Sequence, residues 1–479
     1  MTSFQKFVST RVLISFCRFV LPMFGALLCA PVWQQEARAQ QAAHTAECCD
    51  DLKSKAIYID YSAPEGTRPE CFGRYLFNVE GDVEWGVGRG VFENIRTTTF
   101  DLPSGSRHFS NPNVATWMEY DGISVSIIVP QGRFGIDGPE NYVKNAIEQL
   151  LNRQYESIRE YEGAIEYQRG RLNMFQSELH SHQNESKTES RRHPRPQELN
   201  IEIREIEARI AELKSAITEI KASYKEIELG SPDATVFIAH AWIYAWFKRG
   251  DRIIQFDMPL DPGEESEAKF LAVLRRFHTR KSNEIPTEPG ICLPDGFVAD
   301  DGTRPSSLAM SFRYTDVPNV LYTLKLETYH TKTTWSLRPR EPARVTAALL
   351  GSSYRITGRA LDTKGVDVVN TFGPRDVRMG QLPGIQGGWM MRFAQPGESV
   401  FESYSVYTGF DGFVGSLALP AVAFEMRSFP KGLAPDELTT QPPPFDQSMK
   451  RYEAILSSLR LRPTQPPLSE VVEHLEVAR

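Results

Sequence analysis

Two stretches of the chain place hydrophobic residues at the spacing of paired helices. Residues 158–179 advance by steps of 3 and 4, and residues 199–227 repeat these steps without a break at Leu199, Ile203, Ile206, Ile210, Leu213, Ile217, Ile220, Tyr224 and Ile227. This heptad pattern is typical of two helices packed along a seam. The polar segment 180–196 predicts the turn between them. We therefore expect residues 139–230 to form an antiparallel helical hairpin, with arms at about 140–182 and 197–229.

Before and after this segment, the hydrophobic pattern is that of β-strands. Residues 72–79 alternate, 123–129 alternate and then become wholly apolar, and 235–247 form one apolar, aromatic run. Arg249-Gly250-Asp251 is interpreted as the turn of a hairpin that leads into another strand. Further strand-like runs, separated by Gly and Pro, lie at 312–314, 320–330, 344–350, 354–362, 388–394, 401–408 and 413–426. This punctuation predicts antiparallel sheets.

A weak internal repeat suggests two related halves. Cys71-Phe-Gly-Arg-Tyr-Leu-Phe opens the first half and Cys292-Leu-Pro-Asp-Gly-Phe-Val opens the second. An amphipathic helix is predicted at the end of each, over 266–280 and 447–463. The alternative is a coincidence between two short patterns. The duplication predicts an α+β fold with two related antiparallel-sheet domains, 40–285 and 286–479, each closed by a helix and the first carrying the hairpin.

The N-terminal 39 residues have the pattern of an export signal. Lys6 and Arg11 precede an apolar stretch that is densest over 19–33, and Ala37-Arg38-Ala39 is a small-x-small cleavage site before Gln40. The alternative is an uncleaved anchor, which the prolines and arginine within the stretch disfavour. Because no later segment is long and apolar enough to span a bilayer, we expect a periplasmic protein with no stable membrane insertion.

Charge and cysteine content narrow the classes of partner. The 479 residues include 54 Lys and Arg against 61 Asp and Glu, a net charge of −7, which argues against binding to nucleic acid.

Four cysteines follow the signal segment: Cys48, Cys49, Cys71 and Cys292. An oxidising compartment permits disulfides, and four cysteines allow three pairings. Cys71 and Cys292 are candidates for a bridge, with Cys48 or Cys49 as candidate partners.

The sequence offers no recognisable catalytic, metal or cofactor site. It lacks the nucleophile elbow, the zinc-protease motif and the Walker A loop. His180, His182 and His193 fall in the polar turn of the hairpin, where metal binding would be adventitious. Gly86-x-Gly88-x-Gly90 is interpreted as a bent strand. No nucleophile, base and orienting group can be nominated together, which favours binding over catalysis.

The two opening motifs and the closing segment Tyr452-Glu-Ala-Ile-Leu-Ser-Ser-Leu-Arg-Leu-Arg-Pro463 resemble a known family. The resemblance is to the type VI secretion immunity proteins that neutralise lipase effectors, in the fourth lipase class, and it spans residues 68–463. Seven residues match motif positions and are interpreted as structural: Cys71, Gly73, Arg74, Tyr75, Cys292, Gly296 and Phe297. Cys48, Cys49 and the length of the hairpin depart from the family pattern.

The resemblance implies two α+β domains, export to the periplasm, no enzymatic activity and no cofactor. It also implies one protein partner, a phospholipase effector held in a 1:1 complex, with its lid or active-site mouth clamped. Which residues touch the effector is left open. The alternative functions are an envelope scaffold that assembles through the helical hairpin, and an enzyme whose site is not visible in the sequence.

Overall fold

The computed structural model describes residues 63–88, 98–99, 116–128, 138–185, 195–261, 265–281, 284–302, 304–328, 366–393, 401–410, 412, 420–431 and 440–462. All of them lie within one compact unit, Leu52–Arg479. The predicted signal segment, Cys48, Cys49 and the strand-like runs 344–350 and 354–362 lie outside the described residues. Among the helices described, none is both long enough and apolar enough to cross a bilayer.

The first half of the chain contributes a run of six paired strands to a large sheet. In chain order they are β6 (Thr116–Tyr120), β7 (Ile123–Ile128), β8 (Tyr224–Ile227), β9 (Ala234–Ala239), β10 (Trp242–Arg249) and β11 (Arg252–Pro259). Their order in space is β6-β7-β11-β10-β9-β8, and all these pairings are antiparallel. The six strands therefore lie in the order first, second, sixth, fifth, fourth, third.

The second half repeats this order. Its strands are β15 (Ser306–Tyr314), β16 (Val317–Glu327), β17 (Val366–Met379), β18 (Leu382–Phe393), β19 (Phe401–Phe410) and β20 (Ala421–Ser428), and they lie in the order β15-β16-β20-β19-β18-β17. The first strands of the two runs, β6 and β15, pair antiparallel, so both halves share one sheet. The predicted α+β class is confirmed, whereas the division into two domains at 285/286 stays a prediction.

Short strands extend the sheet beside this junction. Strand β3 (Val83–Trp85) pairs with β15, while β4 (Val87–Gly88) pairs with β5 (Thr98–Thr99) and makes one parallel bridge to β7. Gly86 lies between β3 and β4 and Gly88 ends β4, while Gly90 lies outside the described residues.

The alternating sequence pattern determines which face of each strand is buried. In β20, for example, Val422, Phe424 and Met426 are buried and the residues between them are partly exposed. Phe424 stacks on Tyr452 of helix α6 (Phe445–Ser457), with 4.8 Å between ring centroids. Residues from both halves contribute to the same large core cluster. Burial of this apolar surface is the main source of stability for the shared sheet.

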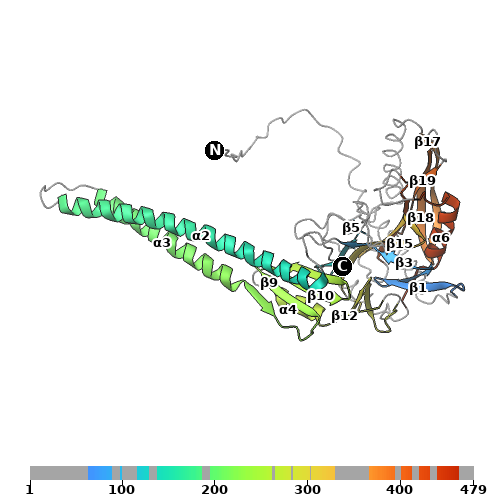
Figure 1. The fold of residues 1–479 in the computed structure, drawn as a ribbon, viewed down its shortest axis with the longest axis horizontal. Helices are drawn as coiled ribbons and strands as arrows, with labels where there is room; N and C mark the ends of the chain where they lie inside the picture. Colours follow the sequence, from blue (N-terminus) through green and yellow to red (C-terminus); the bar gives the residue numbers. More distant parts are fainter. Residues whose placement is uncertain are drawn as a thin grey trace, which may run out of the picture. The chain divides into compact units, whose positions relative to one another are not determined.

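The predicted helical hairpin consists of α2 (Gly138–Glu185) and α3 (Arg195–Ala222), which lie side by side in Figure 1. The heptad positions form the seam between them: Ile165, Ile206, Ile210 and Leu213 are buried together, with Tyr161, Leu172, Phe175 and Ile217 packed around them. Near its N-terminal end, α2 packs on the sheet through Tyr142, Val143, Ala146 and Leu150, which contact Phe237, Ala239, Trp246 and Ile253.

Two of the predicted strand and helix boundaries in this region are wrong. The second arm ends at Ala222 and not near 229, because Tyr224–Ile227 forms the edge strand β8, whose backbone pairs with β9. The apolar run 235–247 is two strands and not one. His240 adopts a positive φ of 58° at the turn between β9 and β10, and its N–H donates to Ser223 O. The sequence hid this turn because almost every residue of the run is apolar, although His240, Ala241 and Trp242 are exposed at the turn.

Both closing helices are shorter than predicted. Helix α4 (Ser266–Leu274) ends before β12 (Phe277–Thr279), and α6 ends before β21 (Arg460–Leu461). Phe277, which continues the apolar stripe of the first helix, is buried from a strand against Phe247 and Phe256. The helical pattern stops where the backbone finds pairing partners in another part of the chain.

Replacing Ile210 and Ile217 together by Asp should unfold the hairpin while the sheet stays folded. Two carboxylates would enter the α2–α3 seam, at a cost of several kcal/mol. Hydrogen exchange should show loss of protection in α2 and α3 and retained protection in β10 and β16. The matched control is Ile201→Asp on the same helix, because Ile201 is 57% exposed and its replacement should change little. Loss of protection throughout the sheet would instead make the hairpin part of the core.

Candidate functional site

The two opening motifs form two β-hairpins that are completed by distant strands. The first consists of β1 (Thr67–Phe72) and β2 (Tyr75–Glu80), and the second of β13 (Gly290–Leu293) and β14 (Gly296–Ala299). Strand β21, at the end of the second half, pairs with β2 of the first half. Strand β12, at the end of the first half, pairs with β14 of the second. Each opening hairpin is therefore completed by the closing strand of the other half.

Side-chain packing shows the same exchange. Phe77 of the first hairpin stacks on Phe312 of β15, with 5.5 Å between ring centroids. It also shares a small apolar cavity with five residues of the second half: Leu324, Phe424, Ile455, Leu456 and Leu459. In the second hairpin, a Cβ on Gly296 would meet Phe277 and Ile254, which belong to the first half. Each hairpin thus packs mainly on the half of the chain to which it does not belong.

The two hairpins meet at their cysteines. Cys71 and Cys292 form a disulfide with a Cα–Cα distance of 5.7 Å, and both are fully buried. Beside it, Gly73 N donates to Cys292 O and Cys292 N donates to Gly73 O, both at 2.8 Å. Gly73 has a positive φ of 57°, and a Cβ there would collide with Leu326. The bridge joins the two opening cysteines to each other, and this differs from the expected partners Cys48 and Cys49.

Two buried arginines occupy equivalent places around the crossing, which is the contact between the two opening hairpins at Cys71 and Cys292. Arg280 follows β12 and Arg462 follows β21. The backbone N–H of Arg280 donates to Asp295 O, and the backbone N–H of Arg462 donates to Arg74 O. Asp295 and Arg74 each lie three residues after the hairpin's cysteine, so the two arrangements correspond. The Arg280 guanidinium donates to Leu293 O, Gly296 O, Glu284 O and Cys71 O. Arg462 donates to Gly290 O, Pro286 O and Glu288 O, at 2.7–3.0 Å.

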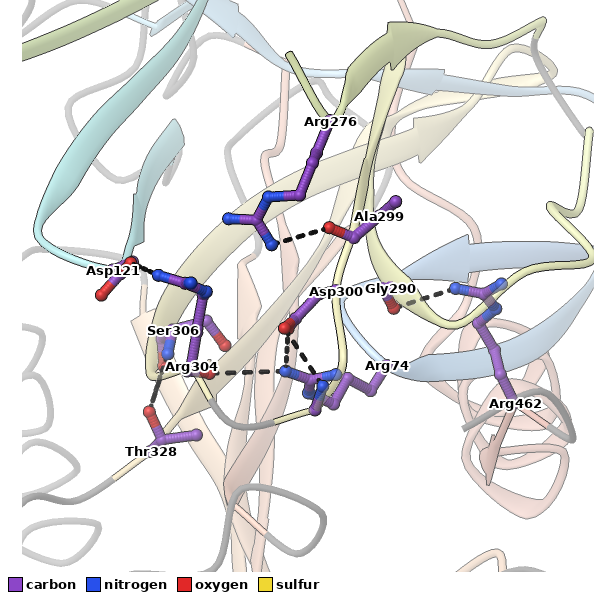
Figure 2. A network of polar contacts seen from close by, with 11 residues as sticks. Arg74, Asp121, Arg276, Gly290, Ala299, Asp300, Arg304, Ser306, Thr328 and Arg462 are labelled. Carbon is purple, nitrogen blue, oxygen red and sulfur yellow. Dashed lines mark hydrogen bonds and ion pairs between the residues drawn. The ribbon is translucent and has the colours of Figure 1, made fainter. Parts of the chain in front are cut away.

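Further polar contacts link the halves (Figure 2). Arg74 forms a buried ion pair with Asp300. Arg276 donates to Ala299 O at 3.0 Å, and Arg304 pairs with Asp121 in the β6–β7 turn at 2.5 Å. In every one of these pairs, one residue lies before position 285 and the other after it. The network therefore ties the two halves together across the sequence junction.

Burial shifts the pKa values of these groups. Removal from water raises the pKa of the Asp300 carboxyl, and the neighbouring Arg74 opposes this rise. For Arg462, burial, followed by the positive charges of Arg280 and Arg74, lowers the pKa to about 10. At neutral pH the guanidinium keeps its charge, which its carbonyl partners stabilise. These shifts have structural causes and do not prepare a proton-transfer group.

Asp295, in the turn of the second hairpin, is held by two arginines of the β10–β11 hairpin. Its carboxylate pairs with Arg249, and at 2.7 Å with Arg252. Arg249 and Gly250 belong to the Arg-Gly-Asp sequence, and Gly250 has a positive φ of 58°. The tripeptide is thus a β-turn, as expected, and its arginine is engaged within the protein.

The structure brings the motif residues of the sequence together at this crossing. Gly73 and Arg74 form the first turn, Tyr75 is buried beside Leu461, and Gly296 and Phe297 begin β14. Arg462 lies over the ring of Phe297 at 5.0 Å. Arg280, Arg462 and Asp300 were not singled out from the sequence. No local signal marked them, because both arginines lie in segments predicted to be helical and Asp300 has the pattern of an ordinary loop residue.

The other candidates do not form a site. His182 lies 3.9 Å from Glu178 within α2, and His193 and His330 fall outside the described residues. His240 is exposed in the β9–β10 turn. In the part of the chain that the structure describes, no three His, Cys, Asp or Glu side chains gather in a way that could hold a metal ion. The crossing is built to hold backbones in place, with guanidinium groups on carbonyl oxygens.

Residues 284–464 match the family model of the Tle cognate immunity protein 4 C-terminal domain. Over this region, the chain is similar to the Tli4 family. The matched range runs from the second opening hairpin to β21, so it includes both Cys292 and Arg462. Tli4 proteins provide immunity against the Tle lipase effectors of the type VI secretion system (T6SS) and are not enzymes. The resemblance found in the sequence is confirmed over residues 284–464.

Solved structures were also compared with the chain. The immunity protein TplEi of the Pseudomonas aeruginosa T6SS, complexed with "L" peptide, is 12% identical, covers 84% of this chain and 100% of its own, and has a TM-score of 0.43. The Tle4–Tli4 complex gives 13% identity, the same coverage and a TM-score of 0.44. A search of curated proteins found no match.

Proposed function

We propose that the mature chain acts in the periplasm, where it binds one cognate Tle lipase effector in a 1:1 complex and blocks phospholipid hydrolysis. The observation that carries this proposal is the match of residues 284–464 to the Tle cognate immunity family. The N-terminal pattern of basic residues, apolar stretch and small-x-small site supports export. A lipase injected by a sibling cell would meet its inhibitor in that compartment.

The proposed mode of inhibition is a clamp on the lid or active-site mouth of the lipase. A lipase acts at a membrane surface, where its active-site cover must move aside, so an inhibitor need only hold that cover or fill the opening. Two halves with the same strand order offer two related surfaces to one partner. Protection from self-intoxication requires slow release, and this favours an interface of at least standard size, about 1,600 Å² in total.

Protection of cells tests both the immunity and its compartment. Cells that produce the cognate lipase in the periplasm should survive when the chain is made with residues 1–39 and should lyse when these residues are deleted. A chain carrying an unrelated export signal in place of 1–39 is the control and should protect. Equal protection by the leaderless chain would contradict the periplasmic site of action. Lysis in every case would contradict the immunity role and favour the envelope scaffold.

A further inference from the structure

The Cys71–Cys292 disulfide lies at the point where the two exchanged hairpins cross. The bonded residues are 221 positions apart, and each belongs to a hairpin that packs mainly on the other half. The bond therefore connects the two halves and does not simply close a local loop. Its immediate neighbours, Leu76 and Phe297, are also buried. The sulfur atoms of two free thiols lie farther apart than those of a disulfide, and a close-packed site leaves little free volume for this larger separation.

The strands that complete the exchange are very short. Strand β21 pairs with β2 through only Tyr75↔Leu461 and Leu76↔Arg460, and β12 pairs with β14 over three residues. A disulfide restricts the unfolded chain most when the closed loop is long, as it is here. Without the bond, β21 must find β2 from the opposite end of the chain by non-covalent contacts alone, whereas β12 and β14 are close in the sequence. The crossing is consequently the part of the fold that gains most from the covalent link.

We propose that formation of this disulfide is a redox latch that converts the exported chain into its inhibitory form. The proposal rests on the periplasmic immunity function proposed above. Before export, in a reducing compartment, the two thiols stay reduced and the exchanged hairpins open readily. After export, oxidation fixes them. Because the sulfurs are fully buried in the folded protein, the closed latch is shielded from thiol reductants.

The chemistry is thiol–disulfide exchange with an oxidised dithiol protein or a small-molecule disulfide. One cysteine thiolate attacks the oxidant disulfide to give a mixed disulfide, and the second cysteine thiolate displaces the reduced oxidant. The S–S bond of the oxidant breaks and the Cys71–Cys292 bond forms. Two electrons pass to the oxidant, which leaves as two thiols carrying the two protons released by the cysteines.

Hydrogen exchange and lipase inhibition should be measured on the mature chain in three forms: oxidised wild type, wild type reduced by a dithiol in denaturant and refolded without oxidant, and Cys71→Ser/Cys292→Ser. The latch predicts faster exchange in β1, β2, β13, β14 and β21 after loss of the bond, with little change in β10 and β19. We expect a Tm lower by about 5 °C or more and inhibition of the cognate lipase at least tenfold weaker. Reoxidation of the reduced wild type should restore all three values. Cys48→Ser/Cys49→Ser is the matched control and should behave as wild type.

If the Ser variant fails to fold, the reduced and reoxidised wild type still decides the matter. Unchanged exchange and inhibition after reduction, with free thiols confirmed by mass spectrometry, would overturn the latch. Failure of the oxidised wild type itself to inhibit would overturn the proposed function. In that case the hydrogen exchange of the crossing would still show whether the bond controls the exchanged hairpins.

Discussion

A chain cut between Ser282 and Asn283 should give two fragments of which neither folds alone. Residues 40–282 would contain the sheet run β6 to β11 without β13–β14, whose apolar side belongs on that sheet. Residues 283–479 would contain β15 to β20 without β1–β3, whose Phe77 and Trp85 pack on Phe312. Each fragment would expose an apolar surface. In the first fragment β12 would lose its partner β14, and in the second β21 would lose its partner β2. We expect no cooperative thermal transition from either fragment, and recovery of one transition when the two are produced together.

The fragments should also remain linked under non-reducing conditions, because Cys71 and Cys292 lie on different pieces. Each fragment alone should lose essentially all inhibition of the lipase, while the reassembled pair inhibits. A nick between Lys187 and Thr188, at the turn of the helical hairpin, is the control and should leave the transition nearly unchanged. Cooperative folding of one isolated fragment would show that the exchange is dispensable. Full inhibition by one fragment would contradict the two-sided clamp but not the immunity role.

Replacing Arg74 by Met should be among the most damaging single substitutions. The side chain of Asp300 is fully buried, and without Arg74 its carboxylate would have lost its ion-pair partner. Breaking a buried pair by removal of one partner costs about 3–5 kcal/mol, because an uncompensated charge is left behind. Burial already raises the pKa of Asp300 despite the arginine, so loss of Arg74 should raise it further and favour the protonated form in the folded state.

The raised pKa of Asp300 determines how the stability of the Arg74→Met variant depends on pH. A carboxyl with a raised pKa in the folded state stabilises the fold below its unfolded pKa, and that contribution is lost as pH rises through the folded value. The Arg74→Met variant should therefore be closer to wild type in stability at pH 5 than at pH 8. Denaturant unfolding at both pH values measures this. Arg74→Met combined with Asp300→Asn should cost less than the sum of the two single changes.

The control for this ion pair is an exposed one. Arg209 and Glu212 on α3 are paired, but their side chains are 54% and 66% exposed. Replacing Arg209 by Met should cost less than about 1 kcal/mol, because solvent screens such a pair. If Arg74→Met cost no more than Arg209→Met, the network of Figure 2 would not be what joins the halves.

The sequence predicted elements whose pattern is local and periodic. The heptads of α2 and α3 were visible because Ile203, Ile206 and Ile210 recur at the spacing of one helix face. The alternation of Val422, Phe424 and Met426 likewise predicted a strand. Where a run is almost wholly apolar, as over 235–247, periodicity carried no information and the turn at His240 was missed.

The exchange of hairpins could not be predicted because it depends on pairings between distant residues. Tyr75 pairs with Leu461, and nothing near either residue in the sequence indicates the other. Arg280 and Arg462 each look like an ordinary basic residue after a helix, although their role is to bind carbonyl groups at the crossing. The opening motifs were found through the weak internal repeat and the resemblance to a family, and the structure shows that they lie against each other.

The central proposal is that this protein neutralises a Tle lipase by stoichiometric binding. The purified mature chain, from Gln40 onward and in its oxidised form, should be titrated into its cognate lipase at a concentration well above the dissociation constant, with phospholipid hydrolysis as the readout. We expect activity to fall linearly to zero at one inhibitor per lipase, with nanomolar or tighter affinity, on the order of −12 kcal/mol, and no lipid turnover by the chain itself. Full lipase activity at several-fold excess of the intact chain would contradict the account.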